Sequence, residues 1–321
     1  MNQITRRGFV GMLATAPLLP GIANAQGDAV IKIVVGVPPG GTSDMMARLT
    51  AKKLGEELKV PTIVENHPGA SGIIGGAYVA HAAPDGNTLF LAASSHATAP
   101  FLYKDMPYDT DKDLVPVALV SSTPYVLAVH PKLGVSTLKE LIALLKAHPG
   151  QYSYASSGPG TAQHLAAEMV KRQAGVQMTH VPYRGSGAAF PDVLAGRVPI
   201  LFENIAVMTP YIKQGAMRAL AVTSKERVAF LPDVPTMEES GLPGFEVLGW
   251  FALWAPARTP AAQIARLNAA VNQFLKDPQL LKQLASVGAE PMGGSPERQA
   301  HWLKAEETKW GGLIRDIGIK L

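Results

Sequence analysis

The stretch that decides the fold is Ile31-Lys-Ile-Val-Val-Gly-Val-Pro-Pro-Gly-Gly-Thr-Ser-Asp44. It predicts a buried strand, a sharp turn through the two prolines and two glycines, and the first turn of a helix. The first N–H groups of a helix lack partners and its dipole is positive there, so this turn suits an anion. Related strand–loop–helix units recur at residues 68–72, 156–161 and 184–187. Several such loops converging on one cleft would hold a small carboxylate with neutral groups alone.

Strands and helices alternate through most of the chain, which is typical of an α/β fold with parallel sheets and helices on both faces. Strands are predicted at residues 30–37, 61–65, 88–93, 115–129, 152–156, 178–182, 199–204, 216–223 and 245–256. Helices are predicted at residues 42–58, 71–81, 137–147, 161–174, 188–196, 207–214, 260–276, 278–287 and 296–317. After residue 256 we expect helices only.

The two long strands, near residues 115–129 and 245–256, are the natural places for the chain to cross between two domains. We therefore predict one domain at residues 28–124 plus 250–321 and another at residues 125–249. A chain of 321 residues is long enough for two domains with full cores. Two crossings make a hinge between the domains possible.

The N-terminus has the pattern of a targeting segment. Arg6 and Arg7 precede an apolar stretch at residues 9–23, and Ala23-Asn24-Ala25 is a small-residue cleavage signal. We predict a twin-arginine-like signal peptide at residues 1–25, and hence a periplasmic mature protein. A general secretory signal can look similar, so the export route stays open.

Composition excludes several classes of function. The chain has no cysteine, which excludes disulfides, thiolate catalysis and cysteine-bound metals. The formal net charge is only +4, and two of the positive charges leave with the predicted signal peptide. Such a balanced charge argues against nucleic acid as a partner. The eight histidines are scattered without metal-ligand spacing, so we predict neither a metal nor a cofactor.

The motifs of the chain form a set in a fixed order. They lie at residues 37–44, 64–72, 83–86, 154–161 with His164, 180–186, 219–223, 231–236, 241–245 and 288–291. Any one of them is weak evidence. Together, at these spacings and across the whole mature chain, they resemble the Bug-type solute-binding receptors of the tripartite tricarboxylate transporters.

The resemblance implies a two-lobed α/β architecture of the periplasmic-binding-protein kind (Venus-flytrap, type II-like), with a hinge of crossing strands. A small organic carboxylate would sit between the lobes, held by loop amides, hydroxyls and ordered water. The closed receptor, expected to be a monomer, would deliver it to the membrane permease subunits of the transporter without turnover. Members of the family differ in ligand, which can be a di- or tricarboxylate, an acidic amino acid or an aromatic acid.

Two positions depart from the common pattern of the family. Val37 stands where many relatives have an aromatic residue, and His67 stands where many have arginine. The smaller wall at Val37 favours a larger or aromatic acid as ligand. The change at His67 concerns a local surface contact.

The first loop supplies the largest group of candidate ligand contacts. They are Val37, Pro39, Gly40, Gly41, Thr42, Ser43 and Asp44. The alternative is an ordinary βα loop, since short glycine motifs are common. The loop lacks the lysine and the spacing of a nucleoside-triphosphate loop and the three-glycine pattern of a dinucleotide site. We expect Asp44 to complement the helix dipole and to cap nearby amides.

The other candidates end or follow predicted strands, which is the usual ligand edge of an α/β sheet. They are Ser94, Ser95 and His96; Ser156, Ser157, Gly158 and Thr161; Arg184, Gly185 and Ser186; and Asn204. His96 could instead be a solvated loop side chain, and Arg184 could form a structural ion pair. Thr161 is also predicted to cap the helix that follows it. His164 and His180 are expected to be structural.

Two other functions stay open. Ser157 with His164 and a carboxylate is the one conceivable triad of a periplasmic serine hydrolase, although the Gly-x-Ser-x-Gly pattern is absent. A ligand-loaded partner of a membrane sensor would use the same outer surface as a transport receptor. The sequence favours a receptor, because loop amides and hydroxyls satisfy a desolvated carboxylate without a costly buried countercharge.

Overall fold

The computed structural model describes residues 30–229 and 231–319, so the predicted signal peptide lies outside it. The strands are β1 (Ile31–Val35), β2 (Thr62–Asn66), β3 (Thr88–Ala93), β4 (Leu114–Val129), β5 (Ser153–Ser156), β6 (Thr179–Pro182), β7 (Ile200–Asn204), β8 (Arg218–Val222), β9 (Leu248–Pro256) and β10 (Glu290–Pro291). The α-helices are α1 (Thr42–Leu58), α2 (Ile73–Ala80), α3 (Ser95–Leu102), α4 (Leu138–Ala147), α5 (Ala162–Ala174), α6 (Ser186–Leu194), α7 (Ile205–Lys213), α8 (Ala261–Phe274), α9 (Pro278–Ser286) and α10 (Pro296–Ile317). Single 3₁₀ turns are η1 (Ala70–Gly72) and η2 (Pro131–Leu133). None of the helices in the described ranges has both the length and the apolar character that a bilayer span requires.

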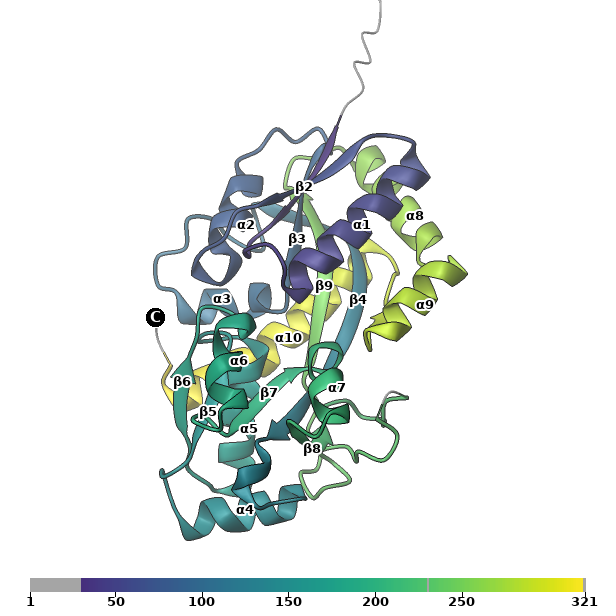
Figure 1. Ribbon diagram of the computed structural model, residues 1–321. Coiled ribbons are helices and arrows are strands. Elements are labelled where there is room, and N and C mark those ends of the chain that lie inside the picture. Colours follow the sequence, from purple (N-terminus) through teal and green to yellow (C-terminus); the bar gives the residue numbers. More distant parts are fainter. Residues whose placement is uncertain (1–29, 230, 320–321) are drawn as a thin grey trace, which may run out of the picture.

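The molecule has two lobes, as Figure 1 shows. The upper lobe contains β1, β2, β3 and β9 with helices α1, α2 and α8, and the lower lobe contains β5 to β8 with helices α4 to α7. The strand order is β2-β1-β3-β9-β4-β7-β5-β6, and β8 and β10 also pair with β4. β1 is parallel to β2 and β3, and β5 is parallel to β6 and β7. The predicted two-lobed α/β fold is therefore confirmed.

Strand β4 belongs to both lobes. Its first part, from Leu114 to Pro124, pairs antiparallel with β9. From Tyr125 to Val129 it pairs with β7 and β8. The chain thus passes from the upper sheet to the lower sheet within one uninterrupted strand.

The helices that follow parallel strands begin at the ligand edge of each sheet. α1 and α3 begin after the carboxyl ends of β1 and β3, and α5, α6 and α7 begin after those of β5, β6 and β7. Figure 1 shows that the two edges turn toward the junction of the lobes. Loops from both halves of the chain can therefore reach one region.

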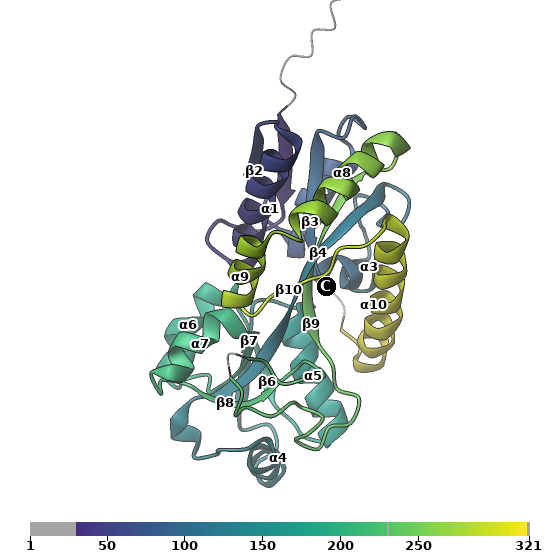
Figure 2. The ribbon, with the colours of Figure 1, turned by 90° about the vertical axis from the view of Figure 1, so that its right-hand side faces the viewer.

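Helix α10 ties the lobes together by packing. Leu303 in its first half packs in the upper core near Trp254, whereas Trp310 in its second half packs in the lower core near Phe202. Figure 2 shows α10 beside α3 along one side of the molecule. Leu102, the last residue of α3, also belongs to the lower core. The two cores are thus joined by side chains as well as by β4.

Glu306 of α10 is the hydrogen-bond acceptor of two tryptophans, one on β9 and one on α10 itself. Glu306 Oε2 accepts a hydrogen bond from Trp250 Nε1 at 3.0 Å and from Trp310 Nε1 at 2.8 Å. Trp250 and Phe251 at the start of β9 are both buried in the core.

Most elements lie where the sequence predicts them, and α1, β3 and α10 agree to the residue. Most other predicted bounds shift by one to three residues, as at β9, which begins at Leu248 and not at residue 245. Four further differences stand out. Helix α3 was not predicted, and β10 lies in the region where only helices were expected. The helix predicted from residue 71 begins at Ile73, because Ala70 and Ser71 have φ of 46° and 55°. β1 ends at Val35, two residues before the predicted end.

Candidate functional site

The loop between β1 and α1 presents free amides at the start of α1. Gly41 precedes the helix and has no side chain that could cap it, so the N–H groups of Thr42 and Ser43 have no hydrogen-bond partner among the described residues. The amide of Gly40 is not free, because it donates to Asp44 Oδ2 at 3.0 Å. Gly40 has φ of 94°, a conformation that favours glycine.

Asp44 is held from inside the protein. Its carboxylate accepts two hydrogen bonds from the Arg48 guanidinium, at 2.9 and 3.0 Å, and one from Asn66 Nδ2 at 2.9 Å. Burial opposes ionisation, but these bonds together with the Gly40 amide outweigh it and hold the pKa of Asp44 below its usual value. The expected capping of a nearby amide is confirmed. The same Asn66 amide donates to Val37 O at 3.0 Å, so this network fixes the shape of the loop.

Ser94, Ser95 and His96 lie at the start of α3 rather than in a loop. Ser95 Oγ donates to Ser71 O at 2.9 Å. The alternative of a solvated loop histidine was wrong, because His96 is 4% exposed and packs 4.8 Å from Trp254, ring centre to ring centre. Burial lowers the pKa of His96 to about 4, so the ring is neutral at physiological pH.

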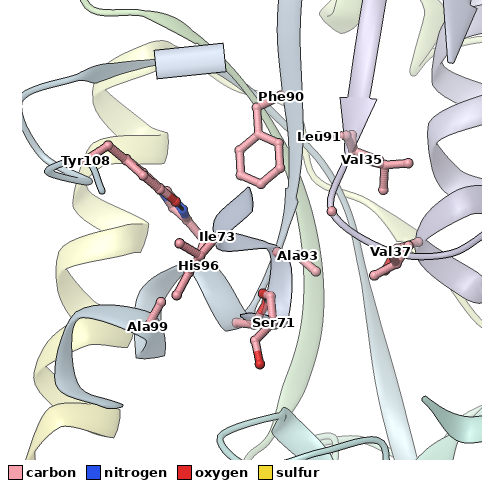
Figure 3. A pocket seen from close by; sticks show the side chains of 14 residues that line it. Val35, Val37, Ser71, Ile73, Phe90, Leu91, Ala93, His96, Ala99 and Tyr108 are labelled. Carbon is pink, nitrogen blue, oxygen red and sulfur yellow. Dashed lines mark hydrogen bonds between the residues drawn. The ribbon is translucent and has the colours of Figure 1, made fainter. Parts of the chain in front are cut away.

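A narrow pocket opens between these loops in the upper lobe. The candidates Val37, Ser43, Ser95 and His96 line it. In Figure 3, Val37 lies on one side of the pocket and Tyr108 on the opposite side. The enclosed part measures about 20 Å³, which is room for one water-sized group.

Sequence reasoning missed several residues that line this pocket. They are Ser71, Gly72, Ile73, Phe90 and Tyr108, together with parts of β1 and β3. The positive φ of Ser71 turns the chain into the pocket wall. A Cβ added at Gly36 would lie 2.3 Å from Gly72 Cα, so the two loops touch backbone to backbone. The glycine-rich motif at residues 68–72 was the available signal.

In the lower lobe, the loop between β5 and α5 uses its hydroxyls internally. Ser156 Oγ donates to Gly158 O at 3.1 Å, and Thr161 Oγ1 donates to the same carbonyl at 2.7 Å. The predicted side-chain cap by Thr161 was therefore wrong, although Thr161 does occupy the capping position. The half-buried Ser157 has no side-chain partner in the described part of the chain. The N–H groups of Ala162 and Gln163 in the first turn of α5 are likewise unpaired there.

Two histidines, His164 and His180, contact this loop. His164 Nδ1 accepts a hydrogen bond from the Gly160 amide at 2.9 Å, and His180 Nε2 lies 2.6 Å from Ser156 Oγ. The two imidazoles stack with ring centres 4.0 Å apart. Burial lowers the pKa of His164 to about 3 and that of His180 to about 4. The expected structural role of both side chains is confirmed.

The described residues do not form the catalytic triad of a serine hydrolase. Ser157 and His164, the residues of the conceivable triad, share no hydrogen bond. The serine that does meet a histidine is Ser156, which is 1% exposed and out of reach of a substrate. No three His, Asp or Glu side chains among residues 30–229 and 231–319 gather as a metal site would require.

The loops after β6 and β7 complete the lower half of the site. The Gly185 amide donates to Ser157 O at 3.1 Å, which joins this loop to the β5–α5 loop. The first N–H groups of α6, at Ser186 and Gly187, have no partner in the described chain. Arg184 is exposed and forms no ion pair with any described residue, so the structural ion pair considered for it is not seen.

Both polar groups of the Asn204 side chain form hydrogen bonds within the protein. Its Oδ1 accepts from the Ala206 amide at 3.0 Å and thereby caps α7, and its Nδ2 donates to Thr123 Oγ1 at 3.0 Å. That second bond ties the end of β7 to the middle of β4. These two bonds fix the Asn204 side chain where β7 meets β4. A contact between Asn204 and a ligand stays a prediction.

The two halves of the site meet at two places. Thr98 Oγ1 on α3 donates to Gly160 O in the β5–α5 loop at 3.1 Å. Tyr125 on β4 lies between Ser94 of the upper lobe and Glu203 of the lower lobe, and burial and the Glu203 carboxyl both raise its pKa. Through these contacts α3 of the upper lobe meets the β5–α5 loop of the lower lobe, and Tyr125 joins Ser94 to Glu203.

Comparison with known proteins gives a consistent result. Residues 46–319 match the profile described as tripartite tricarboxylate transporter family receptor. Protein BugT of Bordetella pertussis is 37% identical over 325 residues, which is 100% of this chain and 100% of that protein. The structure of R. palustris Rpa4515 with adipate is similar with a TM-score of 0.85 at 35% identity, over 91% of this chain and 98% of that chain. The periplasmic binding protein BugD is similar with a TM-score of 0.83 at 34% identity, over 91% of this chain and 99% of that chain.

Proposed function

The chain belongs to the family of tripartite tricarboxylate transporter receptors, and on this premise we propose that it is a periplasmic receptor for a small organic carboxylate. The ligand binds between the lobes, and the loaded receptor, a monomer, delivers it to the membrane permease subunits of the transporter. The protein needs no cofactor and performs no turnover. The adipate held by Rpa4515 and the description of BugD as a periplasmic binding protein support this function.

One observation carries the proposal: helices of both lobes begin with N–H groups that have no partner among the described residues. Thr42 and Ser43 supply them in the upper lobe, and Gln163 and Ser186 supply them in the lower lobe. A helix start offers both hydrogen-bond donors and the positive end of the dipole. These donors are uncharged, so they can bind a carboxylate without a buried countercharge.

We assign the lobes to residues 28–124 plus 250–321 and to residues 125–249. The change of pairing partner on β4 between Pro124 and Tyr125 supports the first crossing. The second crossing lies at the start of β9. Two segments depart from this division, because Leu102 at the end of α3 and Trp310 in α10 both pack in the lower core.

Closure of the lobes would bring the donors together around the ligand. The ligand shifts the population toward the closed form to the extent that it makes contacts available only there. The candidate contacts are the N–H groups above, the hydroxyls of Ser43 and Ser157, and the Arg184 guanidinium for a second ligand charge.

Mass spectrometry of the native protein tests the proposal, because a tightly bound ligand co-purifies with it. Titration calorimetry of the stripped protein against adipate, malate, glutamate and benzoate then measures binding and separates the ligand classes. We expect one carboxylate to bind at a stoichiometry of one, with no product formed. A folded sample that binds no carboxylate, alone or in the co-purified fraction, would refute the function.

A further inference from the structure

The narrow pocket of the upper lobe has a half-buried rim and buried walls. The rim includes Val37 and Ser43, and the walls include Ile73, Phe90 and Ala99, each no more than 5% exposed. Figure 3 shows Val37 at one side of the pocket and Ala99 at the other. The empty space of the pocket, with its open mouth, measures about 350 Å³, which is at the lower end of the range of ligand pockets. A small organic group can therefore enter it from the rim.

The walls of this pocket are electrically neutral. Among the described residues that line it, none is an aspartate, glutamate, lysine or arginine. Its two titratable side chains, His96 and Tyr108, are buried and uncharged near pH 7, because burial lowers the pKa of the histidine to about 4 and raises the pKa of the tyrosine. A charged group of a ligand inside the pocket would therefore meet no countercharge from these side chains.

Several hydroxyls of the pocket are already engaged with the protein. Ser95 Oγ donates to Ser71 O at 2.9 Å, and Ser71 Oγ lies 3.3 Å from Tyr103 Oη. Tyr108 Oη lies 3.5 Å from His96 Nδ1. A carboxylate needs several donors once it leaves water, and it would find few in these walls. An apolar group needs none, and it gains free energy from burial against the apolar walls.

The charged end of a ligand has its place at the rim of the pocket. Ser43, which lines the pocket, has an N–H group at the start of α1 without a partner among the described residues. A carboxylate bound to this N–H group has its carbon chain beside the mouth of the pocket. The upper lobe thus offers a donor for one carboxylate and neutral apolar walls for the chain attached to it.

We propose that the narrow pocket of the upper lobe is the subsite for an apolar end of the ligand, so that the receptor prefers an aliphatic monocarboxylate to the dicarboxylate of the same carbon chain. This inference rests on the proposed function and names the class of its ligand. The enclosed part of the pocket measures about 20 Å³, so it takes a group about as large as a water molecule, such as the terminal methyl group of a chain. A monocarboxylate can fill it with its chain end while its charge stays at the rim.

Matched pairs of acids test this preference on the wild-type protein. The acids of each pair, butyrate and succinate, pentanoate and glutarate, or hexanoate and adipate, differ by one terminal carboxylate. In calorimetry of the stripped protein near pH 7, we expect the tightest-binding monocarboxylate to bind about tenfold or more tightly than its matched dicarboxylate, because the second charge loses its water without gaining a partner. Each methylene group that enters the pocket should tighten binding about fourfold until the chain is too long.

A pair of variants links the preference to the pocket. Ala93→Val adds two methyl groups to a half-buried residue that lines the pocket at the end of β3. It should weaken binding of the tightest monocarboxylate about fourfold or more and shift the preference to a shorter chain. Ala219→Val is the matched control, because Ala219 is a half-buried residue of β8 in the lower lobe and does not line the pocket. It should leave every Kd unchanged. Melting curves without ligand show whether both variants fold, and the wild-type pairs decide the question without them.

Three results would overturn the subsite and leave the proposed function standing. They are a dicarboxylate that binds as tightly as its matched monocarboxylate or more tightly, an affinity that a folded Ala93→Val leaves unchanged, and binding of malate, glutamate or benzoate by a protein that binds none of the six paired acids. A folded wild-type protein that binds no carboxylate at all, in these titrations or in the co-purified fraction, refutes the proposed function and this inference with it.

Discussion

Replacing Thr42 by proline removes one free backbone donor while leaving the fold intact. Thr42 is the first residue of α1, where proline is favoured because its missing N–H would have no partner in the helix. The preceding Gly41 has φ of −91° and ψ of 175°, an extended conformation compatible with a residue before proline. The substitution therefore acts on the ligand donor and not on the helix.

The expected loss follows from the kind of bond. A hydrogen bond to a charged group contributes about 1.5–3 kcal/mol, so Thr42→Pro should raise the Kd of the carboxylate about 10- to 150-fold. Calorimetry with the carboxylate found in the binding panel measures this change. The melting temperature without ligand should stay close to that of the wild type, because no protein partner of the Thr42 amide is lost.

Two control variants isolate the amide. Thr42→Ala removes the hydroxyl but keeps the N–H, and should bind nearly as the wild type does. Ala261→Pro places proline at the exposed first residue of α8, after Pro260 at φ −57° and ψ 138°, away from the candidate loops. It should leave the Kd unchanged. If Thr42→Pro binds as tightly as the wild type, the start of α1 does not hold the ligand and the reasoning fails.

Three further predictions concern stability and chemistry. Burial raises the pKa of Glu203 in the folded protein above its unfolded value of 4.5, so the free energy of unfolding should fall as pH rises from 4.5 to the folded pKa. Glu203→Gln should remove this pH dependence and should melt at a higher temperature at neutral pH. Calorimetric melts at a series of pH values measure both effects. Gly36→Ala would place a Cβ 2.3 Å from backbone and should cost about 1–3 kcal/mol in denaturant unfolding, whereas Gly312→Ala, with open space around its Cβ, should not destabilise. Any trace of ester hydrolysis should persist in Ser157→Ala; its loss would revive the hydrolase.

The sequence predicted the loops of the site because each carries a local signal. The run from Ile31 to Asp44 places a buried strand, a turn and a helix start in order, and α1 begins at Thr42 as the pattern indicates. Alternation of strands and helices is enough to put the loops at the ligand edges of two sheets. These features depend on neighbours in the chain, which a sequence shows directly.

The sequence could not predict which groups in the loops remain free. Ser156 and Thr161 both look like ligand donors, yet both hydroxyls bond to Gly158 O, which is reachable because Gly158 has φ of 136°. The solvated alternative for His96 failed for a similar reason. Its burial depends on Trp254, a residue far along the chain that β9 carries against α3. A donor in these loops is free only if no distant residue pairs with it in the folded protein. The local sequence pattern therefore cannot predict which donors are free.

Three of the titratable groups near the loops share one property, which is that the surrounding protein pairs them or keeps them uncharged. Asp44 is paired with Arg48, and burial keeps His164 and His180 uncharged. A ligand carboxylate that binds at the starts of the helices therefore meets uncharged N–H donors. Binding adds stability that grows with the logarithm of the ligand concentration above Kd and reaches about 2.7 kcal/mol at a hundred times Kd. A shift in the melting temperature of the loaded receptor therefore reports the ligand even where its chemistry is unknown.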